Sequence, residues 1–131
     1  MRALVLSLCA VLTVSACEAD ETISGHGGAG HIWILQEIDG QAFDAQATIE
    51  FPEEGKITGQ GPCNRFSATQ SVPYPWFEAG PIMATKMACP DLAAEQVFFT
   101  ALAEMTLSEV AGDTLILSND AGRDMVFKAQ K

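Results

Sequence analysis

Short apolar runs, each closed by turn residues, are the feature that most restricts what this chain can fold into. Beyond residue 30 these runs are rich in β-branched and aromatic side chains, and they stop at glycine, proline, aspartate or asparagine. Runs of this length and composition are typical of strands. The pattern predicts strands over residues 32–38, 47–51, 56–59, 66–72, 107–111, 114–118 and 125–127, with hairpin turns at 52–55 and 119–122.

One segment has a helical spacing instead. After Pro90, Asp91 can cap a helix, and apolar residues then recur three and four positions apart. These apolar positions are Leu92, Phe98, Phe99, Leu102 and Met105. We therefore predict a mainly antiparallel β fold with one helix (α+β), in which a small curled sheet or partly closed β-barrel carries the helix over an open end or face.

The N-terminal segment resembles the export signal of a bacterial lipoprotein. Arg2 precedes an apolar stretch, residues 3–14, that is too short to span a bilayer permanently but has the length of a signal segment. Residues 14–17, Val-Ser-Ala-Cys, resemble a lipobox. We expect residues 1–16 to be a signal peptide and Cys17 to be acylated, because several acyl chains on one residue make anchoring durable. The alternative is an ordinary secretory signal that ends near a cysteine.

The residues after Cys17 bear on the membrane and on the length of the anchor. Glu18 follows the cysteine, so the aspartate that is often interpreted as an inner-membrane retention signal is absent. By analogy with enteric sorting, we expect the periplasmic face of the outer membrane. Residues 17–30 are acidic and glycine-rich, which predicts an acylated flexible tether. One small domain would then cover residues 31–131.

Two of the four cysteines remain for the folded domain. Cys9 would leave with the signal peptide and Cys17 would carry the lipid. Cys63 and Cys89 would then lie in an oxidising compartment, where thiols tend to pair. A disulfide between them would stabilise the fold by about 3–4 kcal/mol on the loop-entropy model. The alternative is two buried free cysteines.

The chain is strongly acidic. It holds 7 Lys and Arg residues against 17 Asp and Glu residues, for a formal net charge of −10 at pH 7. Such a surface is repelled by nucleic acid and by anionic headgroups. We expect no nucleic-acid partner, and a monomer that contacts the membrane through its N-terminal lipid.

Several stretches, taken in order, resemble the META domain, the domain of HslJ-type heat-shock lipoproteins. Residues 57–66 resemble its glycine-rich Cys-Asn signature, and residues 84–90 resemble its Thr-(Arg/Lys)-Met-Ala-Cys motif. The match extends over about residues 31–129. It implies a small β-rich fold, an envelope location and an association with stress tolerance, without an established set of catalytic residues. The motif residues here are Gly59, Asn64, Arg65, Thr85, Met87 and Glu95.

Some positions depart from the commonest form of the family. Pro62 stands where glycine is usual, Phe66 and Gln70 stand where tyrosine is frequent, and Lys86 replaces an arginine. These departures leave the fold assignment unchanged. They put in doubt any role that needs an aromatic hydroxyl or a guanidinium at those positions.

Glu95 and Asn64 are the polar residues with the clearest structural constraints. Glu95 projects from the apolar face of the predicted helix, where a carboxylate must be paired, hydrogen-bonded or protonated. We expect it to accept hydrogen bonds from the backbone of the Cys63–Asn64 loop or to pair with Arg65. The alternative is a polar centre inside a ligand pocket. For Asn64 we expect a turn in which the side chain bonds its own backbone and tolerates left-handed geometry, rather than contact with a ligand.

An aromatic cluster follows the fourth predicted strand. Tyr74, Trp76 and Phe77 lie beside a proline-rich corner and could form a patch for a partner. The alternative is a strand that feeds Trp76 or Phe77 into the core.

Nothing in the sequence predicts an enzyme. His26 and His31 are the only histidines and lie in the predicted tether and directly after it, so the interior of the domain lacks the usual general base. They could bind a metal weakly, but no third ligand is predictable, and we expect neither a metal nor a cofactor. An enzyme would require distant carboxylates, such as Glu50, Glu78 and Glu95, to converge in one cleft.

We therefore expect a non-enzymatic, lipid-anchored envelope domain that acts by contact with another envelope component. The alternative is a small-ligand carrier with an apolar cavity inside a half-open β-barrel. A cavity of several hundred cubic ångströms lined by apolar side chains would favour the carrier.

Overall fold

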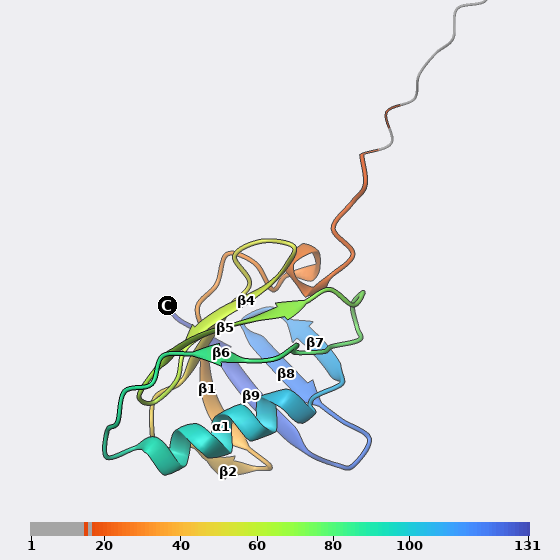
Figure 1. The fold of residues 1–131 in the computed structure, drawn as a ribbon. Coiled ribbons are helices and arrows are strands. Elements are labelled where there is room, and N and C mark those ends of the chain that lie inside the picture. The colour runs from red at the N-terminus through yellow and green to blue at the C-terminus, as the bar shows by residue number, and fades with distance from the viewer. Residues whose placement is uncertain (1–14, 16) are drawn as a thin grey trace, which may run out of the picture.

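Nine strands form one antiparallel sheet in the computed structural model, which describes residue 15 and residues 17–131 (Figure 1). The predicted signal peptide, residues 1–16, lies outside the described residues except for Ser15. In chain order the elements are the 3-10 helix η1 (Ile23–His26), β1 (Trp33–Ile38), β2 (Gln41–Ala42), β3 (Thr48–Glu50), β4 (Gly55–Gln60), β5 (Arg65–Gln70), β6 (Met83–Ala84), α1 (Leu92–Glu104), β7 (Leu107–Ala111), β8 (Thr114–Ser118) and β9 (Asp124–Ala129).

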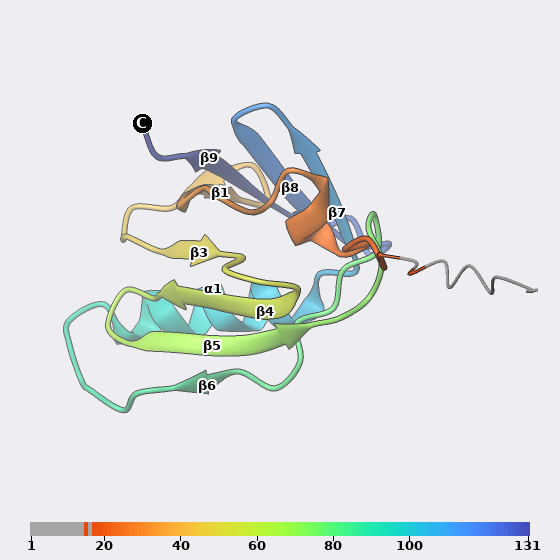
Figure 2. The ribbon, with the colours of Figure 1, turned by 90° about the horizontal axis from the view of Figure 1, so that it is seen from above.

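The sheet is curled and open, which confirms the predicted fold class and excludes the closed form. The strand order is β6-β5-β4-β3-β1-β9-β8-β7, with β2 paired to β1 off this path. The register of β1 against β9 shifts between Leu35 and Glu37, and such an irregularity bends a strand and increases its twist. Figure 2 shows β4, β5 and β6 on one side of the curl and β7, β8 and β9 on the other.

Local sequence accounts for most of the strands. Strands β7 and β8 have the predicted bounds, and their hairpin turns at Gly112, where φ is +61° and a side chain would be disfavoured. The predicted strands over 32–38, 47–51, 56–59, 66–72 and 125–127 are present with shifted ends. Strands β2 and β6 were not predicted, because two residues are too few to show an alternating pattern.

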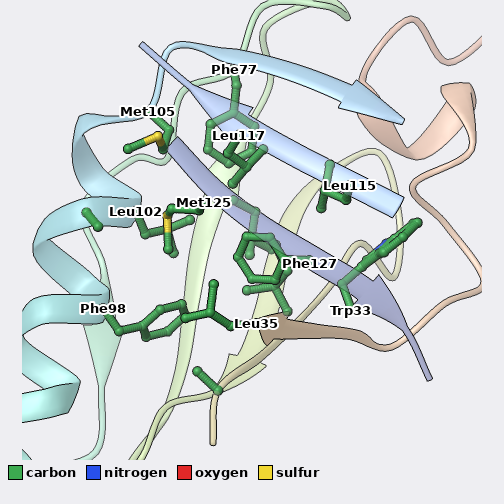
Figure 3. Close-up of a cluster of buried hydrophobic side chains, with 14 of the residues drawn as sticks. Trp33, Leu35, Phe77, Phe98, Leu102, Met105, Leu115, Leu117, Met125 and Phe127 are labelled. Carbon is green, nitrogen blue, oxygen red and sulfur yellow. The ribbon is translucent and has the colours of Figure 1, made fainter. Parts of the chain in front are cut away.

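Helix α1 packs its apolar face into the curl of the sheet. Phe98, Leu102 and Met105 are buried there against Leu35 and Met125 of the sheet (Figure 3). On the other strands the inward positions alternate with half-exposed ones, as in β8. Large side chains fill this interior, namely Trp33, Ile49, Phe51, Ile57, Leu115, Leu117 and Phe127. Leu92, which we predict on the same apolar face, is instead exposed at the start of the helix.

The prediction of a flexible tether over residues 17–30 is wrong for much of that segment. Ile23 is only 1% exposed and belongs to the hydrophobic core. The backbone carbonyl of Glu21 accepts the N–H of Tyr74 at 2.8 Å, and the carbonyl of Gly28 accepts Nε1–H of Trp33 at 2.9 Å. Composition alone does not reveal this, because the single Ile23 is enough to dock a polar, glycine-rich segment onto the core.

None of the helices in the described part of the chain combines the length and apolar character needed to cross a membrane.

Candidate functional site

A disulfide joins the two segments that carry the family motifs. Cys63, in the loop between β4 and β5, pairs with Cys89, just before α1, with the two Cα atoms 5.7 Å apart. This confirms the predicted pairing over the alternative of two free thiols. The bond closes a sequence separation of 26 residues and holds the loop against the start of the helix.

Glu95 lies at the centre of this junction. Its side chain comes from the first turn of α1 and the residue is 2% exposed. The backbone N–H groups of Cys63 and Asn64 donate to Oε1 at 3.0 and 2.7 Å, and Nδ2–H of Asn64 donates to Oε2 at 2.7 Å. Three donors therefore replace water around the buried carboxylate. The backbone half of our expectation for Glu95 is confirmed.

Arg65 is not the partner of Glu95. Its side chain is exposed and forms no ion pair with any residue that the structure describes. Its backbone carbonyl accepts the N–H of Thr85 at 3.1 Å, which ties the start of β5 to the segment after β6. Of the two partners that we expect for Glu95, the backbone of the Cys63–Asn64 loop is therefore the one observed, because the loop supplies enough donors by itself.

Asn64 bridges three segments instead of closing a local turn. Its Nδ2 also donates to the carbonyl of Met87 at 3.0 Å, while Oδ1 accepts the N–H of Met87 at 2.7 Å and the hydroxyl of Thr85 at 2.9 Å. The prediction of left-handed geometry is wrong, since Asp39 is the one non-glycine residue with positive φ in the described chain. The side chain forms hydrogen bonds with residues far away in the sequence, because the segment around Met87 presents both a backbone N–H and a C=O to it. We call Glu95, Asn64, Thr85 and the backbone of Cys63 and Met87 the Glu95 network.

Two glycines allow these close approaches. A Cβ on Gly61 would lie 2.6 Å from Oε1 of Glu95, so a side chain there would displace the carboxylate. A Cβ on Gly59 would lie 2.2 Å from the carbonyl oxygen of Thr48 and 2.6 Å from the ring of Phe66. Gly59 is a motif residue that we single out from the sequence, whereas the role of Gly61 is not evident there. Its position two residues before Cys63 is the signal that could have found it.

A groove opens beside the Glu95 network. It has a volume of about 430 Å³ and lies between the segment that follows β6 and the first turns of α1. Its walls include Ile82, Lys86, Met87, Leu92 and Phe99, together with the inner atoms of the network. We call it the β6–α1 groove. It is open to solvent, and it lies outside the filled core.

The positive charges of this acidic chain are unevenly placed. Lys56, Arg123 and Lys128 each lie within 4 Å of a carboxylate, so much of their charge is neutralised. Lys86 and Arg65 form no ion pair within the described residues, and both lie beside β6. Apart from the C-terminal Lys131, the unpaired cations of the described chain are therefore Lys86, which lines the β6–α1 groove, and Arg65, which lines a neighbouring hollow beside β6.

The three aromatic residues of the predicted partner patch do not form one surface. Phe77 is buried in the core, and its N–H donates to the carbonyl of Thr106 at 2.9 Å. Tyr74 is half-buried, with its ring stacked on His26 at 4.8 Å and its hydroxyl accepting the N–H of Val110 at 3.2 Å. Only Trp76, 59% exposed, faces solvent. The alternative prediction, a core role for Phe77, is correct.

Gln70 is a buried polar residue whose role the sequence did not reveal. Its Oε1 accepts the N–H of Glu78 and its Nε2 donates to the carbonyl of Val72, both at 2.9 Å. It thereby holds the loop that positions Phe77.

Within residues 17–131 the side chains of His, Cys, Asp and Glu nowhere gather in groups of three that could hold a metal ion. Of the three carboxylates that an enzyme would need together, Glu95 alone lines the groove.

Comparison with known proteins agrees with this architecture. A family model described as the META domain matches residues 27–131. An NMR structure of a protein from Burkholderia xenovorans has a TM-score of 0.66 at 19% identity, covering 97% of this chain and 99% of that chain. A crystal structure of a DUF4847 family protein from Bacteroides vulgatus has a TM-score of 0.64 at 13% identity, covering 83% of this chain and 98% of that one. At these identities the two structures show the fold alone.

No curated protein sequence matches the chain. The family model, however, spans both motif segments, the Glu95 network and every strand of the described chain. It confirms the resemblance that the sequence motifs indicate. This chain belongs to the META domain family.

Proposed function

We propose that this protein is a non-enzymatic, lipid-anchored domain of the cell envelope that binds another envelope protein at the β6–α1 groove. The observation that carries the proposal is that exposed apolar side chains, Met87 and Leu92, and the unpaired Lys86 line that groove together. Met87 lines the groove and is 68% exposed, whereas Met83, 70% exposed, lines a neighbouring hollow on β5 and β6 together with Arg65. Exposed apolar surface of this kind marks contact sites.

The edge of the sheet defines the shape of the partner. Strand β6 is the last strand on its side, so its outer backbone groups have no neighbouring strand. An extended segment of another chain can add to such an edge, with its apolar side chains in the groove. Arg65 and Lys86 favour acidic side chains in that segment, because neither has a carboxylate partner in the described chain. The occupant we propose is therefore an extended, apolar and acidic segment of an envelope protein.

The state of Glu95 supports a binding role over a catalytic one. Its two oxygens already accept three hydrogen bonds from the loop and from Asn64, so the carboxylate is engaged by the protein itself. The histidines lie elsewhere, since His26 stacks on Tyr74 and His31 packs against Trp33. Glu95 thus acts on structure and shapes the inner wall of the groove.

The membrane anchor and the stress association complete the proposal. The lipobox-like residues before Cys17 support acylation, Glu18 supports the outer membrane, and the likeness to HslJ-type lipoproteins supports a role under stress. Intact mass of the membrane fraction tests the first point, because an acylated chain that begins at Cys17 is expected. Survival of a deletion strain under heat, compared with a strain that carries the gene on a plasmid, tests the last.

Site-specific photo-cross-linking in cells tests the contact. A photoreactive amino acid at Met87 should give a defined adduct, and one at Asp120, in the exposed β8–β9 turn, should not. The adduct should decrease at least several-fold in an R65E/K86E double variant. Equal adducts at both positions, or an adduct that ignores the charge reversal, would contradict the proposal. A small molecule retained in native mass spectra, without any adduct, would favour the ligand-carrier alternative.

A further inference from the structure

The chain becomes fixed to the body of the domain only three residues after Cys17. The Asp20 carboxylate accepts the N–H of Thr22 at 2.8 Å, the hydroxyl of Thr22 at 2.6 Å and the hydroxyl of Ser24. Glu21 is exposed, but its backbone carbonyl accepts the N–H of Tyr74 at 2.8 Å, and the following Thr22 and Ile23 are buried, with Ile23 in the core. Burial acts to raise the pKa of Asp20, but the hydrogen bonds from Ser24 and Thr22 outweigh it and the pKa is lowered, so the carboxylate stays charged at neutral pH.

This attachment leaves almost no free chain between the lipid and the protein. Cys17 is exposed, and only Glu18 and Ala19 separate it from Asp20. Three extended residues reach about 10 Å, whereas a tether that continued to residue 30 would reach about 45 Å. A domain held within about 10 Å of its lipid anchor cannot rotate freely, so it cannot turn every one of its faces to the bilayer. The face that surrounds Asp20 must remain nearest to the lipid.

We propose that the domain stands on the membrane through one fixed face and directs the β6–α1 groove away from the lipid. This inference rests on the acylation of Cys17, which belongs to the proposed function. The face consists of Glu18, Glu21, Glu54, Ser71 and Pro73, which line a shallow hollow where the N-terminal segment meets the body. We call it the anchor face. Figures 1 and 2 both show the N-terminal segment leaving the body at the end opposite the start of α1.

The chemistry of the anchor face defines the lipid surface that it fits. Three of its residues, Glu18, Glu21 and Glu54, are acidic and it has no cation among the residues that line it. Carboxylates do not enter the hydrocarbon region and are repelled by anionic headgroups. The face therefore rests at headgroup level on a zwitterionic surface, held there by the short chain rather than by affinity. The arrangement keeps the groove accessible to a partner outside the membrane.

Paramagnetic broadening in lipid nanodiscs tests this orientation. The acylated protein is placed in phosphatidylcholine discs that carry a headgroup spin label, and amide signals are compared with those in unlabelled discs. We expect strong broadening at Glu21, Glu54 and Ser71, and several-fold weaker broadening at Lys86, Met87 and Gln96. Insertion of ten Gly and Ser residues between Ala19 and Asp20 should abolish most of this contrast. The same insertion after Lys131 is the matched control and should preserve it.

The outcomes separate this inference from the function on which it rests. Intact mass of the sample first reports whether Cys17 is acylated. An unacylated chain overturns the proposed function and this orientation together. An acylated chain with equal broadening at both sets of amides, or with stronger broadening around the groove, overturns the orientation alone. Broadening confined to the anchor face, and lost on insertion after Ala19, establishes it.

Discussion

Two carboxylates tie distant segments of this molecule together in opposite environments. Glu95 is buried, and its donors are two backbone N–H groups and the amide of Asn64. Asp39 is exposed at the end of β1, where Arg123 donates to its Oδ2 from Nη2 at 2.9 Å. Arg123 also contacts the exposed Glu104 at 2.7 Å. Both carboxylates join residues far apart in sequence, yet they differ in what happens when they are removed.

The difference lies in what can replace the carboxylate. Around Asp39, whose side chain is 42% exposed, water can solvate Arg123 if the aspartate is lost. Exposed ion pairs therefore contribute little, commonly below about 1 kcal/mol. Glu95 is only 2% exposed, so its removal leaves three donors without acceptors at a place that water can hardly reach. A buried carboxylate such as Glu95, which accepts hydrogen bonds from the protein, is thus required for the stability of the fold. An exposed ion pair such as Asp39–Arg123 changes that stability only slightly.

The largest expected effect is that of Glu95→Ala. Removing the carboxylate should lower the free energy of unfolding by about 3–5 kcal/mol, because several buried donors lose their partner. Urea unfolding followed by circular dichroism measures it. Glu104→Ala, at the other end of the same helix, is the matched control and should cost less than about 1 kcal/mol. Similar losses in the two variants would break the comparison between buried and exposed carboxylates.

Removal of the disulfide should rank second. The double variant C63S/C89S releases a closed loop and should lower the free energy of unfolding by about 3 kcal/mol. The same urea experiment, with and without reductant, measures the change, and reductant should affect only the natural chain. If Glu95 alone positions the loop, the double variant retains natural stability, and the shared role of the two features is contradicted.

Gly61→Ala tests the geometry of the Glu95 network more finely. The new Cβ meets Oε1 of Glu95, so we expect a loss of about 2 kcal/mol from a displaced buried carboxylate. In the Glu95→Ala background the same change should cost much less, because its obstacle is gone. Gly30→Ala is the control, since that site has open space and only the strain of a left-handed φ. An equal cost of Gly61→Ala in both backgrounds would place the strain elsewhere.

The smallest effect concerns the exposed carboxylate and depends on pH. The hydrogen bond from Arg123, followed by that from the N–H of Asp124, lowers the pKa of Asp39 below its usual 3.8. Its contribution is therefore complete above about pH 4 and is lost as the pH falls through the lowered value. Asp39→Asn should lose less stability than the natural chain between pH 7 and pH 3, measured by thermal unfolding. Asp120→Asn, at an exposed turn without an ion pair, should follow the natural chain.

Much of the fold could be predicted because its signals are local. Strands β7 and β8 follow from alternation over five residues each and from the turn chemistry of Gly112. The helix follows from apolar residues at helical spacing after Pro90. Even the burial of Glu95 follows from its position three residues before Phe98 and seven before Leu102, because a helix places those residues on one face.

The parts that could not be predicted depend on contacts between segments distant in sequence. Ile23 looks like one apolar residue in a polar tether until the core that receives it exists. The amide of Asn64 has several possible partners, and only the approach of Met87 and Thr85 selects among them. Gly61 is an ordinary loop glycine unless the carboxylate of Glu95 lies against it.

The sequence by itself determined the family, the strands with clear periodicity and the helix, because each depends on local pattern, and it favoured the pairing of Cys63 with Cys89 that the structure then confirmed. The tertiary structure decided where the Glu95 network closes, which cations stay unpaired and how short the free chain after Cys17 is. The physical reason is that burial and the choice of hydrogen-bond partner depend on how segments distant in sequence pack against one another. That packing is defined only when the sheet has curled around its core.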